Sequence, residues 1–137
     1  MSTDSALSIS SVMHPFPHTI GVDQPLRVAL DMLLEHEIRH LPVCERGKLC
    51  GILSDRDIEF ALRVDKAEPT EILVKDCYTP NPYAVTSQTP VGEVARRMAY
   101  EHIGCALVVH DEHVIGIFTT VDACRVLAEV LSGQVEQ

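Results

Sequence analysis

The sequence predicts an α/β fold built from two β-α-β-β-α repeats related by pseudo-twofold symmetry, with their sheets packed together. The main observation is a repeated string: GILSDRDI (51–58) returns as GIFTTVDA (116–123), 65 residues later. In addition, each copy contains helical apolar periodicity and short apolar runs bounded by polar turn residues. A single copy of about 60 residues would bury little surface, so we expect the two copies to share a core.

The agreement between the copies extends well beyond the repeated string. Apolar character is kept at more positions than identity, as at Leu33 and Met98. A duplication explains a gapless agreement of this length better than chance does. The same offset aligns these identical residues: Pro25 with Pro90, Ile38 with Ile103, Val43 with Val108, Gly51 with Gly116, Ile52 with Ile117, Asp57 with Asp122 and Leu62 with Leu127.

Each element of the unit has its own signal in the first copy. HTIGV (18–22) is β-branched and precedes a turn-prone pair and a proline, which suits a strand followed by a helix start. The apolar spacing over 25–37 predicts that helix. LPVC (41–44) and LCGIL (49–53) enclose the polar ERGK, so they predict two strands with a tight connection. DIEFALR (57–63) predicts a closing helix.

The second copy has the same order of signals. It predicts a strand at 83–87, a helix at 90–102, strands at 106–109 and 114–118, and a helix at 121–131. In both copies a glycine, Gly51 or Gly116, stands in the last strand and would let another backbone approach closely.

These signals also set the domain boundaries. The first repeat covers 11–63 and the second 77–131, and the charged, proline-containing stretch 64–76 is the connector. We expect residues 1–10 and 132–137 to be flexible tails.

Composition narrows the class of protein. The 137 residues carry a net charge of −9, with eleven basic residues scattered singly, which argues against a nucleic-acid-binding face. The first residues lack the pattern of a signal peptide, and no apolar stretch approaches the ~20 residues that span a bilayer. The cysteines are odd in number and form no CxxC, which favours buried reduced thiols. We therefore expect a cytoplasmic protein without membrane contact.

Catalytic and metal signals are weak. His14 and His18, His36 and His40, and His110 and His113 lack a carboxylate or cysteine at a metal-site spacing. No nucleophile has a basic partner nearby in sequence. We therefore expect neither a metal site nor an enzyme.

The repeated motif has two interpretations. Ser54 with Asp57, and Thr119 with Asp122, have the spacing of a capping box, in which both side chains satisfy backbone N–H groups at a helix start. The same groups could instead bind a ligand, because a helix N-terminus attracts anions and a carboxylate accepts hydrogen bonds from vicinal hydroxyls.

The two copies differ in their basic residues. Arg56 stands beside the aspartate of the first motif and could clamp a phosphate. The second copy has Val121 at that position, and its nearest base is Arg125, one turn on. The second motif is therefore expected to be the weaker phosphate binder.

The order of elements, HLPV (40–43), GILSDRDI, and VKDCYTPNPYAVTSQTPVGEVARRM (74–98) resemble a tandem pair of cystathionine-β-synthase (CBS) domains, called a Bateman module. The resemblance runs from about Ser11 to Leu131. It implies a stand-alone regulatory module that binds an adenosine-containing ligand (AMP, ADP, ATP, S-adenosylmethionine or NAD) in the cleft between the repeats and signals to a partner protein. The alternative is a ligand-free interaction or dimerisation module.

The resemblance also implies partners and site residues. It implies a homodimer, an adenosyl effector rather than a cofactor, and Mg²⁺ only together with ATP. Phosphate and ribose would contact Ser54, Arg56, Asp57, Thr119 and Asp122. The adenine would lie against Thr19, Ile20, Arg39, His40, Leu41, Ala84, Val85, Cys105 and Ala106. Most residues of this second set, taken singly, would fit plain core packing as well. Arg39 and His40 are the exceptions, because they are polar residues at the entry to a strand and either could face the cleft.

Overall fold

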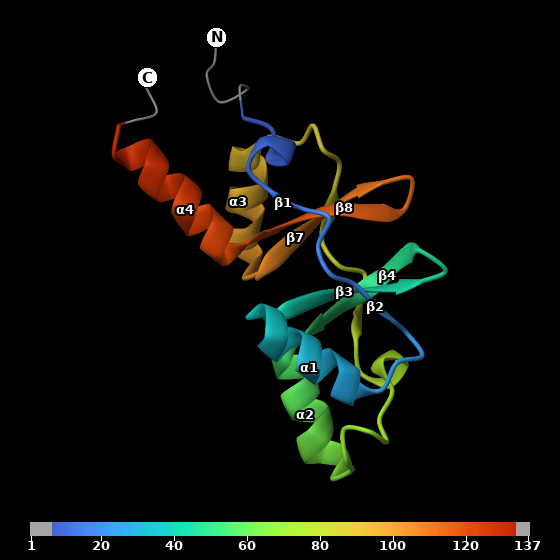
Figure 1. Ribbon diagram of the computed structural model, residues 1–137. Helices are drawn as coiled ribbons and strands as arrows, with labels where there is room; N and C mark the ends of the chain where they lie inside the picture. Colours follow the sequence, from blue (N-terminus) through green and yellow to red (C-terminus); the bar gives the residue numbers. More distant parts are fainter. Residues whose placement is uncertain (1–6, 134–137) are drawn as a thin grey trace. The chain divides into compact units, whose positions relative to one another are not determined.

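The computed structural model describes residues 7–133 and confirms the predicted α/β fold. Both repeats contain the order β-α-β-β-α (Figure 1). The described chain divides into two compact units. The first unit is Pro17–Pro82, and the second combines the segment that ends at Phe16 with the chain from Tyr83 onward.

The first unit is a four-stranded sheet with two helices. The strand order is β2-β3-β4-β5, with β2 parallel to β3 and the other pairs antiparallel. The helix α1 buries Leu26, Ala29 and Leu33, as the periodicity predicted. The elements are β2 (Ile20–Gly21), α1 (Leu26–His36), β3 (His40–Glu45), β4 (Lys48–Ser54), α2 (Asp55–Asp65), a 3-10 turn η3 (Val74–Asp76) and β5 (Thr79–Pro80).

The second unit has the corresponding architecture. Its strand order is β1-β8-β7-β6, and β1 lies beside β8 although the two are far apart in sequence (Figure 1). The elements are a 3-10 turn η2 (Ile9–Ser11), β1 (His14–Pro15), β6 (Ala84–Val85), α3 (Val91–Glu101), β7 (Cys105–His110), β8 (His113–Thr119) and α4 (Thr120–Leu131).

The edge strands β1 and β5 were not predicted, and the segments that carry them differ from the expectation. Ile9, in the predicted N-terminal tail, is fully buried in the core of the second unit. Ile72 and Val74, in the predicted connector, are buried in the core of the first unit. The predicted tail and the predicted connector therefore each contribute buried residues to a core. In the predicted C-terminal tail, Ser132 caps the end of α4. Residues 1–6 and 134–137 lie outside the described residues.

The repeated glycines accommodate these edge segments. A Cβ atom on Gly51 would collide with the backbone carbonyl of Thr79 and with the ring of Tyr78. A Cβ atom on Gly116 would collide with the side chain of Met13. The predicted close approach of another backbone therefore exists at Gly51, whereas at Gly116 the close neighbour is the side chain of Met13.

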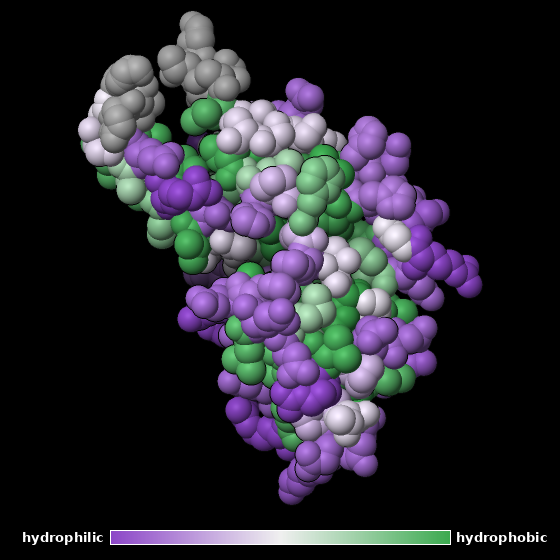
Figure 2. Space-filling view, in the orientation of Figure 1, coloured by the Kyte–Doolittle hydropathy of each residue, from purple (hydrophilic) through white to green (hydrophobic). Residues whose placement is uncertain are grey.

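The helix α4 differs from the other three. It buries none of its residues, whereas α2 buries Ile58 and Ala61. Apolar side chains are visible on its surface (Figure 2). The exposed large apolar residues of α4 are Val121, Leu127, Val130 and Leu131.

The cysteines are less uniformly buried than expected. Only Cys105 is buried; Cys44, Cys50 and Cys77 are half-buried. Cys124 is exposed on α4, so its assignment to the core was wrong. None of the helices within residues 7–133 has the length and apolar character needed to cross a membrane.

Candidate functional site

The repeated motif lies where the last strand of each unit meets the last helix. In the first unit Ser54 ends β4 and caps α2. Its Oγ accepts the N–H of Asp57 at 3.1 Å, and the carboxylate of Asp57 accepts the N–H of Ser54 at 2.9 Å. The second unit repeats this with Thr119 and Asp122, at 3.3 and 2.9 Å. The capping interpretation of the local sequence is therefore confirmed in both copies.

Capping leaves one carboxylate oxygen of each aspartate for other partners, because it uses Oδ2. In the first unit the hydroxyl of Thr79, on β5, donates to Oδ1 of Asp57 at 3.3 Å and to Oδ2 at 3.4 Å. These are long hydrogen bonds from a neutral donor. A ligand hydroxyl could replace the hydroxyl of Thr79 with little loss of hydrogen-bond energy.

In the second unit the corresponding oxygen has a charged partner. Nη2 of Arg125 donates to Oδ1 of Asp122 at 3.0 Å and to the backbone carbonyl of Val12 at 3.2 Å. Oδ2 of Asp122 accepts a further hydrogen bond from the hydroxyl of Thr119 at 3.1 Å. The carboxylate of Asp122 is therefore more fully engaged than that of Asp57.

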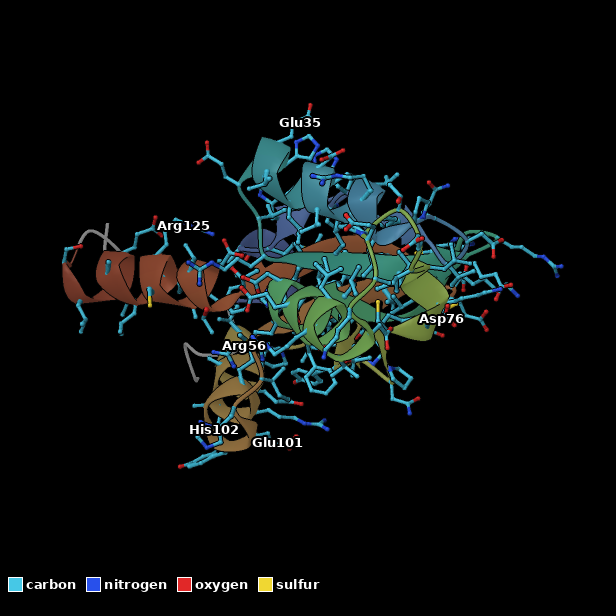
Figure 3. The ribbon with its side chains drawn as sticks, turned by 90° about the horizontal axis from the view of Figure 1, so that it is seen from below. Glu35, Arg56, Asp76, Glu101, His102 and Arg125 are labelled. Atoms are coloured by element: carbon cyan, nitrogen blue, oxygen red, sulfur yellow. The ribbon has the colours of Figure 1, made fainter. Side chains whose placement is uncertain are left out.

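The two arginines of these helices also differ. Arg56 is exposed at the start of α2, and its side chain forms no hydrogen bond or ion pair with any residue of 7–133. Arg125 extends from α4 (Figure 3), and its guanidinium is held by two acceptors. The free guanidinium of Arg56 is thus the one that could reach an anionic ligand.

His40 lies beside the first motif. It begins β3, pairs with Ser54 across the sheet, and is half-buried. Burial lowers the pKa of His40, although Asp55 and Asp57 act to raise it. The side chain is therefore a neutral imidazole at pH 7. In the second unit Cys105 occupies the same place opposite Thr119, and burial raises the pKa of its thiol to about 12.

The other predicted wall residues fall into two groups. Ile20, Leu41 and Ala106 are buried in the cores, so packing accounts for their apolar character. Thr19, Arg39 and Ala84 are exposed, and Val85 is half-buried. The carbonyl of Arg39 accepts the N–H of Asp55, which fixes the start of α2. Contact of this set with an adenine ring stays a prediction.

Sequence reasoning missed two partners of the motif and one ring pair. Thr79 is 22 residues from Asp57 and has no local signal. Val12 is 113 residues from Arg125. His18 and His36 stack with ring centroids 3.7 Å apart, whereas the sequence suggested other histidine pairs. Tertiary folding creates all three proximities; only the three-residue spacing of Asp122 and Arg125 was visible beforehand.

The sequence profile of the CBS domain family matches residues 9–63 and 74–129, and the chain belongs to that family. The chain is also 30% identical to a CBS domain-containing protein of Dictyostelium discoideum over 134 residues, which cover 90% of this chain and 92% of that protein. It is 32% identical over 119 residues to the L-aspartate semialdehyde sulfurtransferase of Methanocaldococcus jannaschii, which cover 85% of this chain. The chain spans only 22% of the length of that enzyme.

Solved structures agree with this family. A structure named as an acetoin utilization protein (AcuB) of Vibrio cholerae superposes with a TM-score of 0.86 at 27% identity, covering 96% of this chain and 97% of that one. The CBS domain pair of protein MJ0100, in complex with 5′-methylthioadenosine and S-adenosyl-L-methionine, gives 0.80 at 28% identity and covers 88% and 99%. CBSX2 in complex with AMP gives 0.75 at 26% identity and covers 90% and 97%.

Proposed function

We propose that this chain is a regulatory module that binds an adenosine-containing ligand at the motif of Ser54, Arg56 and Asp57 and passes the resulting change to a partner protein. One observation carries the proposal. The carboxylate of Asp57 caps α2 with one oxygen, while its other oxygen holds only a neutral, 3.3 Å hydrogen bond. Two of the similar structures contain S-adenosyl-L-methionine with 5′-methylthioadenosine, and AMP.

The chemistry of the motif suits such a ligand. The ribose diol supplies two vicinal hydroxyls, and Oδ1 of Asp57 can accept from them in place of Thr79. A phosphate would meet the positive end of α2 and the free guanidinium of Arg56. Because the helix N-terminus and Arg56 act locally, the net charge of −9 does not exclude an anionic ligand here.

The proposal assigns no catalytic step to this chain. The sulfurtransferase relative is an enzyme, but this chain matches only 22% of its length. We propose that the matched part supplies regulation and that its partner supplies any activity. We further propose a reducing, cytoplasmic compartment, because all five cysteines are free thiols.

We also propose that the chain forms a homodimer. The support is the exposed apolar surface of α4, formed by Val121, Leu127, Val130 and Leu131. Homodimers most often use one surface twice, and an amphipathic helix provides such a self-complementary surface.

Calorimetric titration with AMP, ATP and S-adenosylmethionine tests ligand binding. The informative variant is Asp57→Asn, because an amide oxygen can still accept the N–H of Ser54 while the negative charge is lost. We expect the dissociation constant to rise about ten- to a hundred-fold, the effect of losing charge-assisted hydrogen bonds. Asp55→Asn is the matched control. It makes the same change two residues before Asp57, at a residue that is not one of the proposed contacts Ser54, Arg56 and Asp57.

The alternative function gives a different result. A ligand-free interaction module would show no heat and no rise in melting temperature with any of the three ligands, in the wild type or in the variants. The capping boxes would then be the whole role of the repeated motif.

A further inference from the structure

In the second repeat, Arg125 donates a hydrogen bond to Oδ1 of Asp122, the acceptor that a ribose hydroxyl would need. In the first repeat Oδ1 of Asp57 is the acceptor available to a ribose hydroxyl; in the second, Oδ1 of Asp122 already accepts a charged donor at 3.0 Å. Asp122 is also well covered, with 15% of its side chain exposed, so this ion pair is less screened than a surface pair.

A second contact holds Arg125 in this position. The same Nη2 atom donates to the carbonyl of Val12, in the segment between η2 and β1. The guanidinium is thus bound to the backbone as well as to Asp122. The first repeat has no such group, because the residue that aligns with Arg125 is Phe60, whose side chain is 64% exposed.

We propose that Arg125 is the residue that closes the second repeat to adenosyl ligands, so that the chain binds one ligand, at the first repeat. The inference rests on the proposed function and assigns that function to one of two otherwise similar motifs. A ribose diol must replace a neutral hydroxyl at Asp57 but a guanidinium at Asp122. Charged hydrogen bonds are about twice as strong as neutral ones, and this difference corresponds to about ten-fold in affinity.

Exchange of the aligned residues tests the proposal. Arg125→Phe gives the second repeat the side chain of the first, and Phe60→Arg places a guanidinium three residues after Asp57, the spacing of Arg125 and Asp122. Stoichiometry and affinity are measured by calorimetry with AMP and with S-adenosylmethionine. Arg125→Ala is the second variant, in case phenylalanine disturbs packing around Val12, and thermal melting verifies that each variant is folded.

We expect one ligand per chain for the wild type and two for Arg125→Phe or Arg125→Ala, because the charged competitor for Oδ1 of Asp122 is then absent. We expect Phe60→Arg to weaken the single wild-type site about ten-fold.

Two ligands on the wild type, or an unchanged stoichiometry in both Arg125 variants, would overturn the assignment to Arg125 while leaving the proposed function intact. Weaker binding in the Arg125 variants would show that Arg125 contacts the ligand, and this result would also overturn the proposal that Arg125 closes the second repeat. Absence of binding in every protein would remove the proposed function and this inference together.

Discussion

At the scale of single residues, the two glycines of the repeated motif have different neighbours. A methyl group on Gly51 would meet a backbone carbonyl, which is fixed by the pairing of β4 with β5. A methyl group on Gly116 would meet the thioether of Met13, a flexible side chain that can move aside.

We therefore predict that Gly51→Ala lowers the free energy of unfolding more than Gly116→Ala does. Overpacking of this kind costs about 1–3 kcal/mol, and Gly116→Ala should fall at or below the lower end. Urea unfolding of both variants measures the difference. Equal losses would mean that the backbone near Thr79 yields as readily as the side chain of Met13.

His40 should make stability depend on pH. Burial lowers its pKa in the folded chain, while the unfolded chain takes up the proton near the ordinary histidine pKa of 6.5. As the pH falls below that value, the unfolded state gains protons that the folded state does not, so the free energy of unfolding decreases. His40 thus contributes stability above pH 6.5 that is lost as the pH falls through its folded pKa.

The measurement is the free energy of unfolding between pH 7.5 and about 5, for the wild type and for His40→Gln. We expect the variant to show a smaller loss over this range. His14→Gln, the same change at an exposed position, is the control. An identical slope in His40→Gln would show that other groups produce the pH dependence.

At this scale the sequence predicts contacts between residues that are close in the chain, but not contacts between distant segments. The capping partners Ser54 and Asp57 are three residues apart, so spacing alone revealed them. The third partners, Thr79 for Asp57 and Val12 for Arg125, come from distant segments. They depend on which strand lies at the edge of each sheet, and no local pattern contains that information.

At the scale of elements, predictability followed the strength of the local sequence signal. The four helices and the four long strands, six or seven residues each, all lie where apolar periodicity placed them. The strands β1 and β5 have two residues each, and each contains a proline. The strands β2 and β6 are equally short, but each lies in a β-branched stretch that precedes a helix start. Proline, by contrast, normally argues against a strand unless the strand lies at an edge. The edge position of β1 and β5 accounts for both prolines.

The exposed face of α4 leads to a prediction about assembly. Leu127 is 56% exposed and Leu131 is 74% exposed, and a second copy of this helix could cover both. We expect a dimer by light scattering at tens of micromolar, and a monomer after Leu127→Glu with Leu131→Glu, because a buried charge would oppose pairing. Glu129→Gln, a change on the same helix that adds no charge, is the control. A wild type that is monomeric at this concentration, or a double variant that remains dimeric, would exclude α4 as the interface.

At the scale of the whole molecule, the order of segments along the chain differs from their grouping in space. Residues 17–82 form one unit without interruption, whereas the other unit joins residues from both sides of them. Ile9 is fully buried in that other unit, and its neighbours there include Val94 and Phe118. A cut at the boundaries of the repeats would therefore divide this core.

This grouping has a consequence for how the protein is made. During synthesis the segment with Ile9 and β1 leaves the ribosome early, but its partner strand β8 follows only after about a hundred further residues. The unit of residues 17–82 can complete its sheet in the meantime, because all four of its strands have been translated. The first piece of the described chain to be synthesised is thus among the last to find its place, because the core that covers Ile9 is complete only when Phe118 has been translated.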